Sequence, residues 1–140
     1  MKIDSIHTGY VLDHIAAGNG MKIYNQLGLD TLTCSVAIIK NVKSNSMGKK
    51  DIIKIDQIIA LDFEMLGFID PHITINLIRD GECVEKKHLT IPKKVVNIMT
   101  CKNPRCITRA ERDLDHVFVL TNQEKRTYRC MFCEEEYKGL

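Results

Sequence analysis

The sequence lacks a long hydrophobic run. A helix needs roughly 20 consecutive apolar residues to cross a bilayer, and no stretch of the 140 residues approaches that length, so we expect no membrane partner. The first ten residues, MKIDSIHTGY, contain a lysine but no continuous apolar segment after it, which argues against a secretory signal. The cytoplasm is therefore the expected compartment.

An excess of charge of one sign is also missing. The formal net charge is only +2, with twelve Lys and Arg against eleven Asp and Glu in residues 1–100 and eight against seven in residues 101–140. There is no tryptophan, and aromatic residues make up 6% of the chain, so side chains that stack on bases are few. Because nucleic acid favours basic, aromatic surfaces, we do not expect it as a partner.

Catalytic and phosphate-loop motifs are absent as well. Neither GxxxxGK[ST] nor GxGxxG occurs, which argues against an ATPase or a dinucleotide-dependent enzyme. HExxH and GxSxG are missing too, and the five histidines are scattered along the chain. The sequence therefore predicts a protein that is not an enzyme.

What the sequence does have is two closely spaced cysteine pairs. Cys101 and Cys106 are separated by four residues, Cys130 and Cys133 by two, and 23 residues lie between the pairs. In a reducing compartment this pattern favours a tetrahedral metal site over disulfides, and four thiolates leave no open position for catalysis. We expect one structural Zn²⁺ per chain, with iron in a rubredoxin-like site as the competing metal.

A segment of about 40 residues rarely buries enough apolar surface to fold unaided. Zinc binding can contribute on the order of 10 kcal/mol to folding, so the metal would replace a hydrophobic core in this part of the chain. Cys34 and Cys83 have no close partner in the sequence, and we expect both to be small buried hydrophobic residues.

The hydrophobic pattern predicts the α+β class. Part of residues 3–15 is expected to form a first strand, and residues 31–42 a second strand that is central in its sheet. Residues 51–58 and the two arms around Asp80-Gly81 are expected to form further strands. A first helix is expected near 19–27, capped by Asn19 and with Met21 on its buried face, and a second over 60–69. The order of these elements along the chain (strand, helix, two strands, helix, two strands) predicts a ferredoxin-like sandwich, which is an antiparallel sheet with two helices on one face. A small C-terminal β-rich domain with four cysteine ligands would follow, dividing the chain into 1–94 and 95–140.

Lysines gather in two groups in the first hundred residues. One group lies in residues 40–54, which hold a single acid, and the other in residues 86–94. Such lysines commonly form a solvated face, but Lys50 and Lys54 would project from one face of a strand, and Asp13-His14 could lie near them. Ammonium groups, an imidazole and a carboxylate suit the phosphates and ribose of a nucleotide.

The segments YVLDHI, MGKKDIIKI, IPKKVVNIMTCKNPRCIT and CMFCEEEY, in this order, resemble the regulatory chain of aspartate carbamoyltransferase over nearly the whole length. The resemblance implies a non-catalytic regulatory subunit with an allosteric nucleotide-binding domain (1–94) and a zinc domain (95–140) that docks on the catalytic chain. It implies regulatory dimers that bridge catalytic trimers and control pyrimidine biosynthesis in response to CTP, ATP and possibly UTP.

The resemblance also assigns residues. The zinc ligands would be Cys101, Cys106, Cys130 and Cys133, and Asn103 and Glu134 would contact the catalytic chain. Nucleotide would be bound by Ile3, Asp4, Ile6, Asp13, His14, Lys50, Lys54 and Lys86. Two other interpretations stay open: a zinc-ribbon nucleic-acid-binding protein, which a salt-sensitive gel shift would detect, and an iron electron carrier, which a visible spectrum would reveal.

Overall fold

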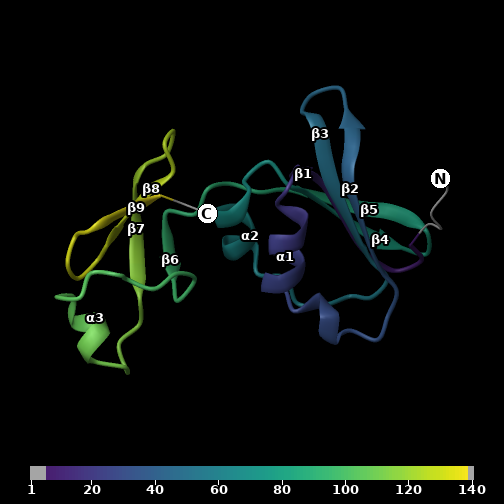
Figure 1. Ribbon diagram of the computed structural model, residues 1–140. Helices are drawn as coiled ribbons and strands as arrows, with labels where there is room; N and C mark the ends of the chain where they lie inside the picture. Colours follow the sequence, from purple (N-terminus) through teal and green to yellow (C-terminus); the bar gives the residue numbers. More distant parts are fainter. Residues whose placement is uncertain (1–5, 139–140) are drawn as a thin grey trace.

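The computed structural model describes residues 6–138, and Figure 1 shows two β-sheets with helix α2 between them. Ile3 and Asp4 lie outside the described residues. Within residues 6–138, no helix is both long enough and apolar enough to cross a membrane.

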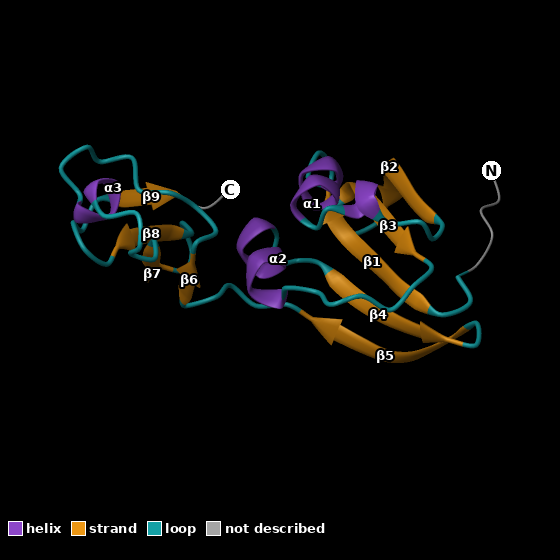
Figure 2. Cartoon of the chain, turned by 90° about the horizontal axis from the view of Figure 1, so that it is seen from below, coloured by secondary structure: helices purple, strands orange, loops and turns teal. Residues whose placement is uncertain are grey.

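The first sheet has five strands in the order β2-β3-β1-β4-β5, and every neighbouring pair is antiparallel. The chain runs through β1 (Gly9–Ala16), α1 (Gly20–Gln26), a short 3₁₀ turn η1 (Leu29–Thr31), β2 (Val36–Ser44), β3 (Gly48–Ile55), α2 (Phe63–Ile69), β4 (Thr74–Arg79) and β5 (Glu82–His88). Both helices cover the same face of the sheet, as Figure 2 shows. The ferredoxin-like sandwich is confirmed, extended by β5.

The alternation of side chains along the central strands explains this arrangement. Leu12, Ile53 and Ile75 point to the helices and are fully or almost fully buried. Since successive residues of a strand face opposite sides, Asp13, Lys54 and Asn76 belong to the uncovered outer face. The fold therefore creates one dry face and one polar face on the same strands.

Local signals were accurate at the turns. The chain reverses at Asp80-Gly81, with φ values of 52° and 81°, which is the hairpin conformation that such a pair favours. Helix α2 begins after Asp62, whose carboxylate accepts a hydrogen bond from the backbone N–H of Met65 at 3.1 Å, a typical N-cap.

Four expectations about the first unit were wrong. Strand β2 is at the edge of the sheet, not its centre. Met21 is 41% exposed, because Ile23 occupies the buried side of α1. Asn19 precedes α1 but its side chain does not cap it and instead donates to Asp70 at 3.4 Å. Cys83 is exposed on β5, an edge strand whose side chains all reach solvent.

The second sheet has the order β6-β7-β8-β9 and is also antiparallel. Its strands are β6 (Lys94–Val96), β7 (Val117–Asn122), β8 (Thr127–Cys130) and β9 (Glu136–Lys138), and a single-turn helix α3 (Ile107–Ala110) follows the first cysteine pair. Of the seven buried residues in its apolar cluster, three are cysteines and one, Phe68, comes from α2. Without the cysteines this unit has almost no core.

Helix α2 contributes to both apolar clusters. Leu66 packs in the first, whereas Phe68 meets the ring of Tyr128 in the second, edge to face with centroids 5.0 Å apart. The segment that connects β5 to β6 passes close to the helix at Gly67, where an added Cβ atom would lie 2.4 Å from the carbonyl oxygen of Thr90. The hydroxyl of Tyr128 donates to the Pro92 carbonyl at 2.6 Å. The two units are thus packed on a shared helix.

Candidate metal centre and nucleotide-binding face

The four paired cysteines converge at one end of the second sheet. Their Sγ atoms all lie within 4.8 Å of one another. Cys101 and Cys133 are 3.6 Å apart, and Cys106 and Cys130 are 3.7 Å apart, so each contact joins one member of each pair. All six cysteines of the chain are free thiols.

These distances fit a tetrahedral metal ion. A metal at 2.3 Å from four sulfur atoms separates them by about 3.8 Å from one another, close to the contacts observed. Three of the four cysteines are buried, as expected for a structural site. The chemistry of the donor set suits Zn²⁺ and also iron, and it leaves no position for a substrate.

Backbone and hydroxyl groups surround the sulfur atoms. The N–H groups of Phe132 and Cys133 point to Cys130, as they do in a tight cysteine turn. The hydroxyl of Thr108 lies 3.0 Å from Cys106 Sγ. Negative charge on the sulfur atoms would therefore meet donors that are already in place.

Proton affinity differs among the four thiols. Burial raises the pKa of Cys130 to about 12, although the backbone N–H groups of Cys133 and Phe132 oppose it. Burial would raise the pKa of Cys106 too, but the hydrogen bonds from Thr108, Cys130 and Cys133 together outweigh burial and lower that pKa to about 7. A metal ion must displace the remaining protons, so metal binding should weaken as pH falls.

The predicted nucleotide residues lie on the outer face of the first sheet. Strand register places Lys54, Val11, Asn76 and Lys86 in one row across β3, β1, β4 and β5. Three strand spacings separate Lys54 from Lys86, or about 14 Å between backbones, and both side chains can reach inward over the row. A ligand lying across this face would meet cations at both ends.

A bulge in β1 shapes the middle of this face. The pairing with β3 shifts between Leu12 and Ile15, so Asp13 and His14 have no regular partner there, and His14 has a φ of 58°. Asp13 binds the Lys50 ammonium group at 2.9 Å, and His14 Nδ1 lies 3.2 Å from the Thr74 hydroxyl. The bulge brings Asp13, Lys50 and His14 to one place, as the sequence predicts.

Asp13 remains ionised in this arrangement. Partial burial would raise its pKa, but the hydrogen bonds from Lys50 and from the His14 backbone N–H, together with the electrostatic effect of these two residues, outweigh burial and hold the pKa below its ordinary value. The carboxylate is thus an acceptor at neutral pH and stabilises the fold above its ordinary pKa, a contribution that is lost as pH falls through the lowered value.

Two buried carboxylates, Asp51 and Asp70, hold the loop after β1 in place. Neither was predicted from the sequence. Asp70 accepts the Ala16 N–H at 2.7 Å. Asp51 is fully buried and accepts three backbone N–H groups, from Gly18, Gly20 and Asn41. In the sequence, Asp51 lies between Lys50 and Lys54, and this setting does not indicate that it accepts backbone hydrogen bonds in the interior. The alternation of apolar residues around Asp51 was the available signal, since it places this carboxylate on the buried face.

Asn76 and Thr74 were also missed. Both lie on β4: Thr74 between Asp13 and His88, and Asn76 between Val11 and Lys86. The Asn76 amide donates to the Val11 carbonyl at 3.2 Å. Polar residues that alternate with Ile73 and Ile75 mark this outer face. Ile6 is buried, but it lies before β1 and away from Asp13. Its neighbour His7 accepts, through its backbone carbonyl, the N–H of Gly81 at the β4–β5 turn.

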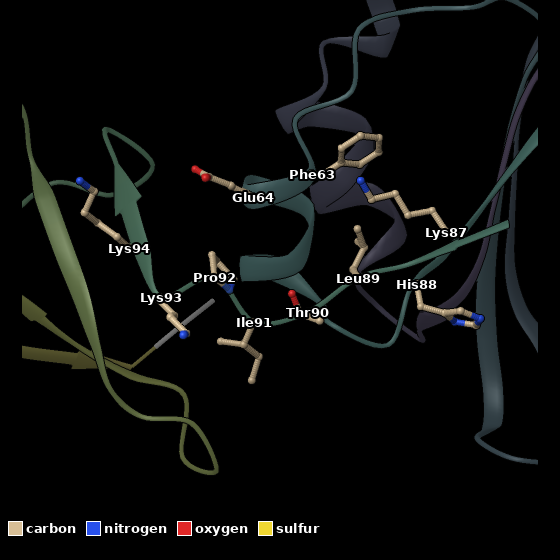
Figure 3. Close-up of a pocket in the computed structure, with 10 residues that line it drawn as sticks. All are labelled: Phe63, Glu64, Lys87, His88, Leu89, Thr90, Ile91, Pro92, Lys93 and Lys94. Atoms are coloured by element: carbon tan, nitrogen blue, oxygen red, sulfur yellow. The ribbon is translucent and has the colours of Figure 1, made fainter. Parts of the chain in front are cut away.

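A groove between α2 and residues 87–94 does not coincide with this face. It encloses about 550 Å³, and Figure 3 shows its basic side chains diverging. Lys93 and Lys94 point in different directions, while Lys87 lies over the ring of Phe63, 3.8 Å from its centroid. Lys87 therefore lies on the helix side of β5, opposite to Lys86.

Comparison with known proteins decides the family. Residues 1–90 match the family model described as aspartate carbamoyltransferase regulatory chain, allosteric domain, and residues 93–139 match the metal binding domain of the same chain. The chain belongs to the aspartate carbamoyltransferase regulatory chain family. A regulatory chain is not the catalytic subunit, so the prediction of a protein that is not an enzyme is confirmed.

Relatives in this family cover nearly the whole chain. The aspartate carbamoyltransferase regulatory chain of Clostridium tetani is 52% identical over 139 residues, which are 99% of this chain and 96% of the relative. That of Clostridium botulinum (strain Hall) is 48% identical over 139 residues, 99% and 95% of the two chains. The Bifidobacterium longum chain is 38% identical over 138 residues, 99% of each. The metal binding domain of the family coincides with the four-cysteine cluster.

The two residues expected to contact the catalytic chain flank the cysteines. The Asn103 side chain is half buried and accepts the Arg105 N–H at 3.0 Å, inside the first cysteine turn. Glu134 is exposed and has a φ of 66°. Nearby, Ile107, Met131 and Phe132 are 52%, 61% and 45% exposed. The cysteine turns thus present apolar side chains next to polar ones.

Proposed function

We propose that this chain is a regulatory subunit that binds CTP and ATP, possibly also UTP, and docks through a zinc domain on the catalytic chain of aspartate carbamoyltransferase. Regulatory dimers would bridge catalytic trimers in the cytoplasm and adjust the first steps of pyrimidine biosynthesis. The observation that carries this proposal is the pair of separate sites, one on each unit, joined by α2 within a chain that matches both domains of the family.

The allosteric domain (1–94) would bind nucleotide on its outer face. Lys54 and Lys86 lie in one row and would meet phosphate as point charges, while the ionised Asp13 would accept hydrogen bonds from ribose hydroxyl groups. His14 and Lys50 complete the centre of the site. Ile3, Asp4 and Ile6 remain proposed base contacts.

The zinc domain (95–140) would be the docking module. Cys101, Cys106, Cys130 and Cys133 would hold one Zn²⁺, which supplies a fixed +2 charge and no chemistry on a substrate. The rigid turns between the cysteines would then present Asn103 and Glu134, with the exposed apolar groups beside them, to the catalytic chain. Interfaces commonly combine such apolar centres with polar rims.

Transmission between the sites would run through α2. A nucleotide can alter the activity of a distant partner only by binding two quaternary states with different affinity. Because Leu66 and Phe68 of one helix pack in different units, a displacement of the first sheet moves a residue that is buried in the second. CTP would favour the low-activity state.

Neighbouring lysines on β5 give a matched test of the nucleotide site. Lys86 belongs to the outer face and Lys87 to the helix face over Phe63. We expect Lys86→Ala to weaken CTP binding at least tenfold in isothermal titration calorimetry, because a phosphate contact is lost, and Lys87→Ala to change it less than twofold.

Equal affinities for CTP in the wild type and Lys86→Ala would contradict the phosphate assignment. Equal losses in both variants would show an effect of net charge instead of a contact. A visible absorption spectrum of the purified chain tests for iron, and a salt-sensitive gel shift tests the nucleic-acid alternative.

A further inference from the structure

A tyrosine on the last strand reaches the metal centre. Tyr137 lies on β9, paired with Tyr128 of β8, and its ring packs edge to face against Phe118 with centroids 5.5 Å apart. Its hydroxyl lies 3.3 Å from Cys101 Sγ and 2.9 Å from the backbone nitrogen of Lys102. One phenol oxygen thus joins the last strand, a cysteine sulfur and the first cysteine turn.

The direction of these hydrogen bonds follows from their chemistry. The Lys102 N–H can only donate, so the phenol oxygen accepts from it. A cysteine sulfur bound to a metal has lost its proton and can only accept. With a metal bound, the phenol proton would therefore be directed to Cys101, and the Tyr137 hydroxyl would donate one hydrogen bond and accept another.

We propose that Tyr137 is a positioning residue of the metal centre, whose hydroxyl donates to the Cys101 thiolate and slows release of the bound metal. This role rests on the metal centre proposed above. Four thiolates around a divalent cation carry a net charge of −2, and a donor to sulfur offsets part of that charge. Partners in the outer shell of metal sites commonly change metal affinity by about 10- to 100-fold.

The same hydroxyl fastens the first cysteine turn to β9. Lys102 precedes Asn103, one of the two residues proposed to contact the catalytic chain, and its N–H is held by Tyr137. Loss of the hydroxyl would free both the Cys101 sulfur and the backbone next to Asn103. The ring contact with Phe118 does not depend on the hydroxyl, so Tyr137→Phe keeps the packing.

Tyr128 provides a matched control. Its side chain lies in the same unit, its hydroxyl donates to the Pro92 carbonyl at 2.6 Å, and its ring packs on Phe68. Tyr128→Phe therefore removes a tyrosine hydrogen bond of the same domain that involves no sulfur atom.

The test measures metal release from the full chain. Zinc content is determined by elemental analysis, zinc transfer to a chromogenic chelator is followed by absorbance, and the Co²⁺-substituted chain is examined for its sulfur-to-metal charge-transfer bands. We expect one zinc per chain in all three proteins, release about tenfold faster in Tyr137→Phe than in the wild type, and shifted charge-transfer bands in that variant alone. Tyr128→Phe should release zinc within twofold of the wild-type rate. Near-ultraviolet circular dichroism checks that each variant is folded.

Two other outcomes have distinct meanings. A wild-type chain with stoichiometric zinc, together with a Tyr137→Phe variant of unchanged release rate and unchanged Co²⁺ spectrum, would overturn the role of Tyr137 and leave the metal centre intact. A wild-type chain without stoichiometric metal would overturn the metal centre itself and this role with it.

Discussion

Glu134 shows at the scale of one residue how stability and docking can conflict. Its φ of 66° lies in the left-handed region, which costs an L-amino acid roughly 1–2 kcal/mol relative to glycine. Glycine loses about 0.5–1 kcal/mol of that advantage through its greater freedom in the unfolded chain. An exposed glutamate at such a position suggests that its side chain has a use outside the fold.

We therefore expect Glu134→Gly to leave the free energy of unfolding unchanged or raise it by up to about 1.5 kcal/mol, while weakening association with catalytic subunits. Chemical denaturation and a binding assay measure the two effects. Glu135→Gly, at an exposed position with no positive φ, should lower stability by about 0.5–1 kcal/mol and leave binding unaltered. Undiminished binding by Glu134→Gly would refute its contact role.

Single residues were predictable where spacing alone defines the chemistry. The cysteine pairs specify their own site, because each turn is local and a tetrahedral ion requires all four sulfur atoms to meet. The buried Asp51 was not predictable, since its donors come from residues 18, 20 and 41 and depend on strand register. Cys83 was misjudged because a strand sequence does not reveal whether the strand lies at an edge.

At the scale of elements, α2 tests the contact between the two units. Alanine is a better helix former than glycine by about 1 kcal/mol, so Gly67→Ala would stabilise an isolated helix. In this structure the added Cβ would meet the Thr90 backbone at 2.4 Å, and such overpacking typically costs about 1–3 kcal/mol. We expect a net loss of stability in thermal unfolding.

The control for this variant is Glu64→Ala, at an exposed position of the same helix, which should change the melting temperature little. A Gly67→Ala protein more stable than the wild type would show that the connecting segment does not press on α2.

Elements with strong local signals and their order along the chain were predicted well, but the position of β2 within the sheet was not. The hairpin at Asp80-Gly81 and the helix after Asp62 follow from residues within a few positions of each other. The place of β2 at the edge follows from pairing between distant segments, which hydrophobicity cannot specify. An apolar strand was therefore wrongly placed at the centre.

The whole molecule consists of one unit with a substantial apolar core and one without. Twelve buried residues form the cluster of the first sheet, whereas the second depends on three buried cysteines and on Phe68 of α2. Removal of the metal should therefore affect the two units differently. The first should keep its fold and its nucleotide affinity, and the second should lose the rigid turns proposed to meet the catalytic chain.

The most direct measurement is assembly with catalytic subunits before and after metal removal, followed by native mass spectrometry, with CTP binding measured on the same samples. We predict that the metal-loaded chain forms a complex with catalytic trimers, that the chelated chain binds CTP but forms no complex, and that added Zn²⁺ restores assembly. A metal-free chain that assembles as well as the loaded one would contradict the account.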